Sequence, residues 1–305
     1  MSAHFSSAGY SNLHSQTRDP EVQPESGPQR YSRFAGGLQW HVKHQGSGTG
    51  RKALLLHGTG SSIHSWNGMF PLLAEQFELL APDLPGHGDT LGGSDNDLTL
   101  GGMSFGVRRL LEELEFDPEL VIGHSAGAAI ALKLCCEGAC RPRHVVGINA
   151  ALLPYGGRLA PAVRPVARLF ASLPGLPGLV AARAKKPGAV ERLIFGSGSK
   201  LGKEEISRYR HLFSSRRHVA STLTMMANWR LEGLLDEFDS TGIPLTLVVA
   251  DNDQMVEPWQ ANRIAEKVKL ARQVSLSGLG HLAHEEDPAT VARTIIGLSN
   301  EACQS

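Results

Sequence analysis

One serine, placed between a predicted strand and a predicted helix, constrains the fold of this chain more than any other feature. The segment 123–127 reads Gly-His-Ser-Ala-Gly. It follows the apolar run 120–122 and precedes the small-residue stretch 128–132, which together predict a strand, a sharp turn and a helix. A serine at such a turn has its hydroxyl lifted clear of the sheet, and the next N–H can face a developing oxyanion. The pattern predicts Ser125 as a nucleophile and the Ala126 N–H as an oxyanion donor.

Two later strand patterns lead to an acid and to a histidine. The apolar run 244–250 leads directly to Asp251 and Asp253, and a later run leads to His281. The carboxyl ends of parallel strands share one edge of an open α/β sheet, so these side chains are expected to meet Ser125 there. The chain order serine, acid, histidine is that of the α/β-hydrolase fold.

A glycine-rich turn follows an earlier strand pattern. The run 52–56 is typical of a buried strand, and His-Gly-Thr-Gly follows it at 57–60. We expect the Thr59 N–H to be the second oxyanion donor. The turn is no dinucleotide fingerprint, because Ile63 stands in place of the third glycine and no acid follows at the required spacing. Trp66 is expected in the core or as a lining residue of the substrate pocket.

Longer segments of the chain also resemble a known fold family. Residues 30–300 resemble an α/β-hydrolase throughout, most clearly at 81–88 (Ala-Pro-Asp-Leu-Pro-Gly-His-Gly) and at 280–288, around His281. Within that superfamily, three segments resemble the magnesium-chelatase accessory proteins of bacteriochlorophyll biosynthesis: 147–154, 196–199 and 225–229. That family has no agreed reaction, so the resemblance implies a pathway and a link to magnesium chelatase, and it implies no substrate.

The resemblance also implies roles for the three polar residues. The family pattern favours Asp253 over Asp251, because its acid lies three residues after Gly or Ala and before a valine, as Ala250 and Val256 do here. We therefore expect acyl transfer to water, in which Ser125 is the nucleophile, His281 is the general base and then acid, and Asp253 orients the histidine. His284 is interpreted as a supporting group, because it and His281 lack a third metal ligand at matching spacing.

The chain divides into three predicted parts. Residues 1–29 are rich in Ser, Gln, Pro and Gly without an apolar run, which predicts a disordered tail and no signal peptide. Residues 30–151 and 242–305 alternate strand and helix patterns and predict one doubly wound sheet. Residues 152–241 show no strand pattern and several prolines, which predict a helical cap over Ser125.

The first part of the predicted cap is basic. From Leu152 to Val190 there is no acidic residue, and the basic ones are Arg158, Arg164, Arg168, Arg183, Lys185 and Lys186. They are either a solvated surface or a rim that attracts the carboxylates of a porphyrin precursor. In the second interpretation, the substrate contacts are His124, Trp66, Trp229, Arg164, Arg168 and Arg183. The charge-free stretch 169–182 is a further candidate for peripheral contact with a membrane or a partner.

Composition removes several other classes of function. The net charge is zero, which gives no reason to expect nucleic acid, and no run reaches the ~18 apolar residues of a membrane span. Cys135, Cys136 and Cys140 share one helical stretch and are interpreted as reduced thiols of a cytoplasmic protein. The motifs imply no metal and no organic cofactor.

Two alternatives remain open at this stage. The same residues could run a cofactor-free lyase or peroxidase-like reaction, although serine at position 125 argues against the aspartate nucleophile of epoxide hydrolases and dehalogenases. Alternatively, the protein binds pigment or assists a chelatase and keeps the three residues without using them.

Overall fold

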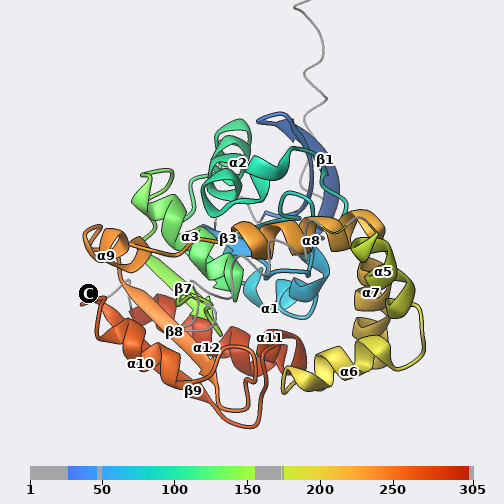
Figure 1. Ribbon diagram of the computed structural model, residues 1–305. Coiled ribbons are helices and arrows are strands. Elements are labelled where there is room, and N and C mark those ends of the chain that lie inside the picture. The colour runs from blue at the N-terminus through green and yellow to red at the C-terminus, as the bar shows by residue number, and fades with distance from the viewer. Residues whose placement is uncertain (1–26, 47–49, 155–172, 174, 302–305) are drawn as a thin grey trace, which may run out of the picture.

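A mostly parallel sheet of nine strands runs through the part of the chain that the structure describes (Figure 1). This computed structural model describes residues 27–46, 50–154, 173 and 175–301. The strand order is β1-β2-β4-β3-β6-β7-β8-β9, and the short β5 pairs with β2. β2 is antiparallel to its neighbours, whereas the pairs from β4 to β9 are parallel. The predicted α/β-hydrolase fold is confirmed.

The strands at the centre of the sheet are buried on both faces. Every residue of β6, β7 and β8 is buried, as expected of parallel strands that helices cover on both sides. The strands are β1 Gln29–Ala35, β2 Leu38–Gln45, β3 Arg51–Leu56, β4 Phe77–Pro82, β5 Leu91–Gly92, β6 Leu120–His124, β7 His144–Ile148, β8 Leu245–Ala250 and β9 Ala271–Leu276.

Two hydrophobic clusters fill the space between sheet and helices. The first joins the sheet to α2, α3, α9 and α10, and the second joins it to α1 and α12. Short segments, among them the 3-10 helices η1 and η2, connect these helices to the strands. Their bounds are η1 Ile63–Trp66, α1 Phe70–Leu73, η2 Asp95–Leu98, α2 Leu100–Glu113, α3 Ala126–Cys136, α9 Leu234–Asp239, α10 Trp259–Ala265, α11 Ala283–Glu286 and α12 Pro288–Glu301.

In the described residues between β7 and β8, four helices form a separate group. They are α5 Leu176–Ala184, α6 Ala189–Gly196, α7 Lys203–Phe213 and α8 Arg216–Asn228. Figure 1 shows α5, α6 and α7 gathered at one side, with α8 extending from them across the centre of the molecule. We call these four helices and their connections the cap. The described residues of 152–241 contain no strand, but α9 packs its Leu234, Leu235 and Phe238 into the first core cluster, so this last helix of the segment belongs to the core.

Several sequence predictions fall outside the described residues. These are most of the predicted tail, Arg158, Arg164 and Arg168, and the first part of the charge-free stretch. Gln29, the last residue of the predicted tail, already pairs with His44 in the sheet. None of the described helices combines the length and the apolar character that crossing a bilayer would require.

Candidate active site

Ser125 occupies the turn between β6 and α3. Its φ of 51° and ψ of −116° are unusual for a residue with a side chain, and such strain is common at functional sites. Neighbouring backbone fixes this conformation, because Ser125 N–H donates to Ile148 O at 3.0 Å and Ala151 N–H donates to Ser125 O at 3.1 Å. A Cβ on Gly127 would lie 2.1 Å from Leu56 O, so the helix can leave the turn only with glycine there.

The glycine-rich segment after β3 is a tight turn. Ser61 N–H donates to Gly58 O at 3.2 Å, and Gly60 at the third position has φ +76°, as a type II turn requires. The hydrogen bond of the turn itself does not use the Thr59 N–H.

This turn packs directly against the serine. A Cβ on Gly58 would lie 3.1 Å from Ser125 Cβ. On the other side of the serine, Ala126 is the first residue of α3, and the first N–H groups of a helix have no partner within it. Thr59 and Ala126 therefore offer backbone N–H groups from both segments that adjoin Ser125.

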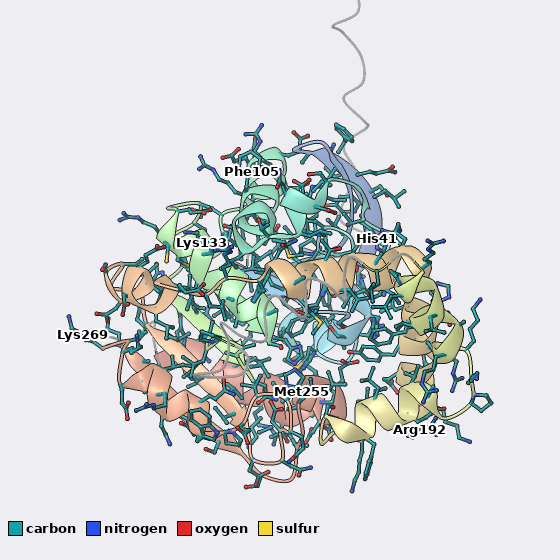
Figure 2. All side chains as sticks on the ribbon, viewed as in Figure 1. His41, Phe105, Lys133, Arg192, Met255 and Lys269 are labelled. Carbon is teal, nitrogen blue, oxygen red and sulfur yellow. The ribbon has the colours of Figure 1, made fainter. Side chains whose placement is uncertain are left out.

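His281 is hydrogen-bonded to Asp253. The distance from His281 Nδ1 to Asp253 Oδ2 is 2.8 Å. Because an ionised carboxylate only accepts, the Nδ1 atom carries the proton and Nε2 keeps a lone pair. The other oxygen of Asp253 accepts from Met255 N–H at 2.7 Å and from Val256 N–H at 2.9 Å, and Met255 is labelled in Figure 2. The side chain of Asp253 is fully buried, so these three donors take the place of water.

The alternative acid has a different partner. Asp251 is exposed, and its Oδ1 accepts from Gly278 N–H at 2.7 Å. The structure thus brings Asp253 to His281, whereas Asp251 stabilises the turn that leads to the histidine.

His124 joins the serine turn to the histidine segment. Its Nε2–H donates to the His281 backbone O at 2.9 Å, and the two rings are 4.8 Å apart. His124 is almost fully buried, and its predicted contact with a substrate stays a prediction. In the described part of the chain no hydrogen bond joins Ser125 Oγ to His281, and contacts of this kind often tighten only in a substrate complex.

Asn149 is a site residue that the sequence reasoning missed. It follows β7 with φ 45°, and its Nδ2 donates to Gly280 O at 3.0 Å and to His281 O at 2.9 Å. Its Oδ1 accepts from Ala250 N–H at 2.8 Å, at the end of β8. The available sequence signal was that Asn149 is a polar residue directly after a buried strand, inside the segment 147–154.

A cluster of buried titratable groups lies behind the histidine segment. Tyr209 OH donates to Glu285 Oε1 at 2.6 Å, while His64 Nε2 and His284 Nε2 each lie 3.9 Å from a Glu285 oxygen. Burial raises the pKa of Glu285 to about 8, against the opposing effect of the Tyr209 hydrogen bond. Burial lowers the pKa of His64 and of His284 to about 3. All three groups are therefore uncharged near neutral pH, as their low-dielectric surroundings require.

The structure gives the surroundings of the remaining predicted substrate contacts where it describes them. Trp66 is fully buried in the second core cluster, in agreement with the first of its two predicted placements, and its contact with a substrate stays a prediction. Trp229 follows α8 and packs, partly buried, against the first core cluster. Arg183 is exposed near the end of α5, and Arg164 and Arg168 lie outside the described residues.

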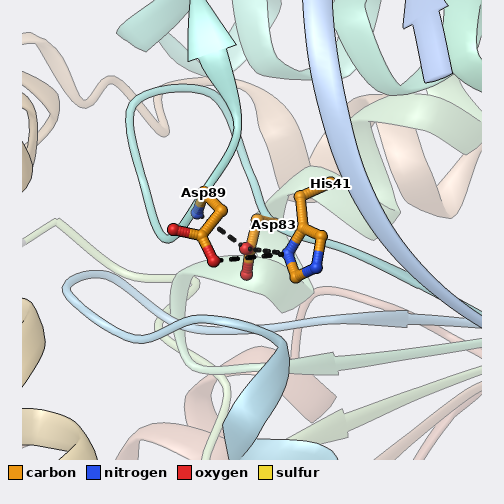
Figure 3. A group of neighbouring side chains, drawn as sticks. All are labelled: His41, Asp83 and Asp89. Atoms are coloured by element: carbon orange, nitrogen blue, oxygen red, sulfur yellow. Dashed lines mark hydrogen bonds and ion pairs between the residues drawn. The ribbon is translucent and has the colours of Figure 1, made fainter. Parts of the chain in front are cut away.

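One group in the described residues has the composition of a metal site (Figure 3). His41 Nδ1 lies 2.8 Å from Asp83 Oδ2 and 3.9 Å from Asp89 Oδ2. The Asp83 side chain already takes part in three hydrogen bonds, because it also accepts from Ile63 N–H at 2.7 Å and from Asp89 N–H at 2.9 Å. These hydrogen bonds indicate that the group stabilises the loop after β4.

Comparisons with known proteins show the family to which the chain is similar. The model of the alpha/beta hydrolase family matches residues 53–294. The chain is 34% identical over 270 residues to the magnesium-chelatase 30 kDa subunit of Rhodobacter capsulatus, covering 88% of this chain and 94% of that protein. Both predicted resemblances, to the α/β-hydrolases and to the magnesium-chelatase accessory proteins, are thereby confirmed.

Solved structures of low identity share the fold. A haloalkane dehalogenase loop variant from Bradyrhizobium elkanii superposes with a TM-score of 0.71 at 22% identity, over 90% of this chain and 97% of that chain. Epoxide hydrolase A from Mycobacterium thermoresistibile gives a TM-score of 0.71 at 19% identity, over 89% of this chain and 98% of that chain. At these identities the likeness concerns the fold alone.

Proposed function

This chain belongs to the alpha/beta hydrolase family, and from that membership we propose that it is a serine hydrolase that transfers an acyl group to water. The observation that carries the proposal is the buried Asp253–His281 pair at the sheet edge where Ser125 occupies its strained turn. Residue 125 is serine, which argues against a reaction that uses the aspartate nucleophile of dehalogenases and epoxide hydrolases.

The proposed reaction assigns one task to each group. His281 Nε2 takes the proton of Ser125 while Oγ attacks the carbonyl carbon, and Asp253 stabilises the imidazolium that forms. The Thr59 and Ala126 N–H groups receive the oxyanion, and one such donor is worth ~2.7–4 kcal/mol in the transition state. His281 then protonates the leaving group, and a water molecule, activated in the same way, releases the acyl group from Ser125.

A labelling experiment tests this proposal. Treatment of the full-length chain with an active-serine phosphonate should add one adduct, on Ser125, by intact-mass and peptide analysis. Ser125→Ala should take up none, and His281→Ala should react much more slowly. A folded wild type that remains unlabelled where ordinary esterases react would rule out a working nucleophile.

A role in bacteriochlorophyll biosynthesis is the finer proposal, and it rests on the similarity to the magnesium-chelatase 30 kDa subunit. An ester or related acyl bond of a porphyrin precursor is the corresponding substrate class. The same similarity favours a second candidate function, in which the protein assists a chelatase without catalysis.

Complementation separates these two functions. The wild type and Ser125→Ala would be expressed in Rhodobacter capsulatus from which the gene for its own 30 kDa subunit has been removed, and pigment would be measured by absorbance. Wild-type pigment with the wild type and a lower yield with Ser125→Ala supports catalysis. Equal pigment from both variants contradicts catalysis as the physiological role and favours the assisting function.

A further inference from the structure

A three-residue segment of the cap lies across both loops that hold the Asp253–His281 pair. It consists of Ser197, Gly198 and Ser199, which follow α6. Figure 1 shows one end of α6 meeting the core beside α11. The backbone O of Ser197 accepts from His281 N–H at 3.2 Å and from Gln254 N–H at 3.2 Å. One carbonyl thus joins the histidine itself to the residue after the acid.

The next two residues continue this pattern. Gly198 O accepts from Asn252 Nδ2–H at 2.7 Å, and Ser199 Oγ accepts from Leu282 N–H at 2.8 Å. The segment therefore holds the residues on both sides of Asp253 and the residue after His281. Ser199 is almost fully buried, so water cannot readily replace its hydroxyl as the acceptor.

The segment and the two loops are in close backbone contact at two glycines. Gly198 has φ +84°, and a Cβ on it would lie 1.9 Å from Asn252 O. A Cβ on Gly280 would lie 2.3 Å from Gly198 C. Backbone therefore packs on backbone from both sides, and this fixes the position of the loops more closely than side-chain packing would.

We propose that Ser197–Gly198–Ser199 is a positioning segment, by which the cap holds the His281–Asp253 pair in its reactive geometry. Ser197 O holds the His281 backbone N–H, while Asn149 and His124 hold the His281 backbone O. The inference rests on the proposed hydrolase function. Its consequence is that the cap supports the chemical step itself, even for a substrate too small to touch the cap.

The test compares three serine variants of the full-length chain. Ser199→Ala removes the acceptor of Leu282 N–H, Ser199→Thr retains a hydroxyl, and Ser207→Ala is the control on the exposed side of α7. With p-nitrophenyl acetate, Ser199→Ala should lose about 10-fold in kcat at little-changed KM, because displacements below 1 Å already cost rate. Ser199→Thr should recover most of the loss, and Ser207→Ala should match the wild type.

A second readout does not depend on activity. Proton NMR of the His281 Nδ1–H, which is hydrogen-bonded to Asp253, reports how firmly the pair is held. Exchange of this proton with solvent should be several-fold faster in Ser199→Ala, and faster still in Gly198→Ala, at temperatures where circular dichroism shows each variant folded. Unchanged kcat and unchanged exchange in both variants would overturn the inference. If exchange is faster in the two variants but the wild type neither hydrolyses an ester nor reacts with phosphonate, the positioning role is retained and the hydrolase proposal is refuted.

Discussion

At the scale of single residues, His281 is held by its backbone as firmly as by its ring. Asn149 and His124 donate to its backbone O, and Asp253 accepts from its Nδ1. A backbone held in this way removes the freedom that a histidine on a loop would otherwise have. The orientation of the ring should therefore depend on Asn149, which does not touch the ring.

Asn149→Asp tests this dependence. Aspartate keeps the acceptor for Ala250 N–H but cannot donate to Gly280 O or His281 O, so the buried Gly280 O loses its partner, whereas His281 O keeps only the N–H of His124. An unsatisfied buried polar group costs ~1–3 kcal/mol, so thermal unfolding should occur at lower temperature. The rate of phosphonate labelling at Ser125 should fall at least about 10-fold, by the positioning argument. Labelling at the wild-type rate would show that Asp253 alone orients the histidine.

The two aspartates after β8 give a matched pair of variants. Asp253→Asn should leave the fold intact and reduce ester hydrolysis by up to ~10⁴-fold, because the amide favours the wrong histidine tautomer. Asp251→Asn should have a far smaller effect, since Asp251 is exposed and supports only Gly278 N–H. Initial rates with p-nitrophenyl acetate decide between them, and the reverse ranking would transfer the role to Asp251.

The sequence predicted the residues of the site whose chemistry is local. Ser125 and the residues 57–60 directly follow strand patterns, and motif with chain order paired Asp253 with His281, which the structure joins by a hydrogen bond, while their catalytic roles stay predictions. Asn149 was missed because its partners are backbone carbonyls 131 and 132 positions away, and nothing in the local pattern indicates them. The sequence left core and pocket lining open for Trp66 for a related reason, since burial depends on what the rest of the chain packs over a side chain.

At the scale of elements, the cap is fastened to the turn that supplies the Thr59 N–H. On α8, His218 Nε2–H donates to Gly60 O at 3.1 Å, and His218 Nδ1 accepts from Gly88 N–H at 3.3 Å. Thr59 Oγ1 lies 3.6 Å from Met225 Sδ, also on α8. The strand and helix patterns predicted the core elements, but these contacts across 130 or more residues could not be read from a pattern. A cap attached in this way cannot leave the core without disturbing the 57–61 turn.

His218→Ala measures this coupling. It leaves Gly60 O and Gly88 N–H without their partner, so we expect lower stability by ~1–3 kcal/mol. We also expect a kcat for a small ester that is reduced by up to ~10²-fold, because the turn loses its fixed geometry. His211→Ala, on the exposed side of α7, is the control. Urea unfolding and ester kinetics on both variants check the prediction, and a stable His218→Ala chain with full kcat would show that α8 only covers the site.

At the scale of the whole molecule, buried histidines make stability depend on pH. Burial lowers the pKa of a group of histidines below its usual ~6.5. They are His57, His64, His87, His124, His144, His218 and His284. Below pH ~6.5 the unfolded chain binds these protons and the folded chain does not, so the free energy of unfolding decreases as the pH falls. Each proton contributes about 1.4 kcal/mol per pH unit, so urea unfolding should show a steep loss of stability between pH ~6.5 and ~4.

Glu285 should act in the opposite direction. Its pKa is about 8 in the folded chain and ~4.5 in the unfolded chain, so the folded state binds the extra proton between these values. Stability contributed by that proton is lost as the pH rises toward 8. His41, whose pKa the hydrogen bond to Asp83 raises, adds a loss of the same sign above pH ~6.5. Stability should therefore be highest near pH ~6.5, because the loss caused by the buried histidines ends there and the losses caused by Glu285 and His41 continue above it.

Glu285→Gln isolates the contribution of this carboxyl. Glutamine keeps the acceptor for Tyr209 OH and presents an N–H where the protonated acid presents an O–H, so the fold should persist. Between pH 6.5 and 8 the variant should lose clearly less stability than the wild type, because of these two effects only that of His41 remains. Glu75→Gln, which changes an exposed carboxyl, should follow the wild-type curve. Urea unfolding at three pH values in this window is sufficient, and parallel curves for Glu285→Gln and the wild type would mean that Glu285 is already ionised inside the folded protein.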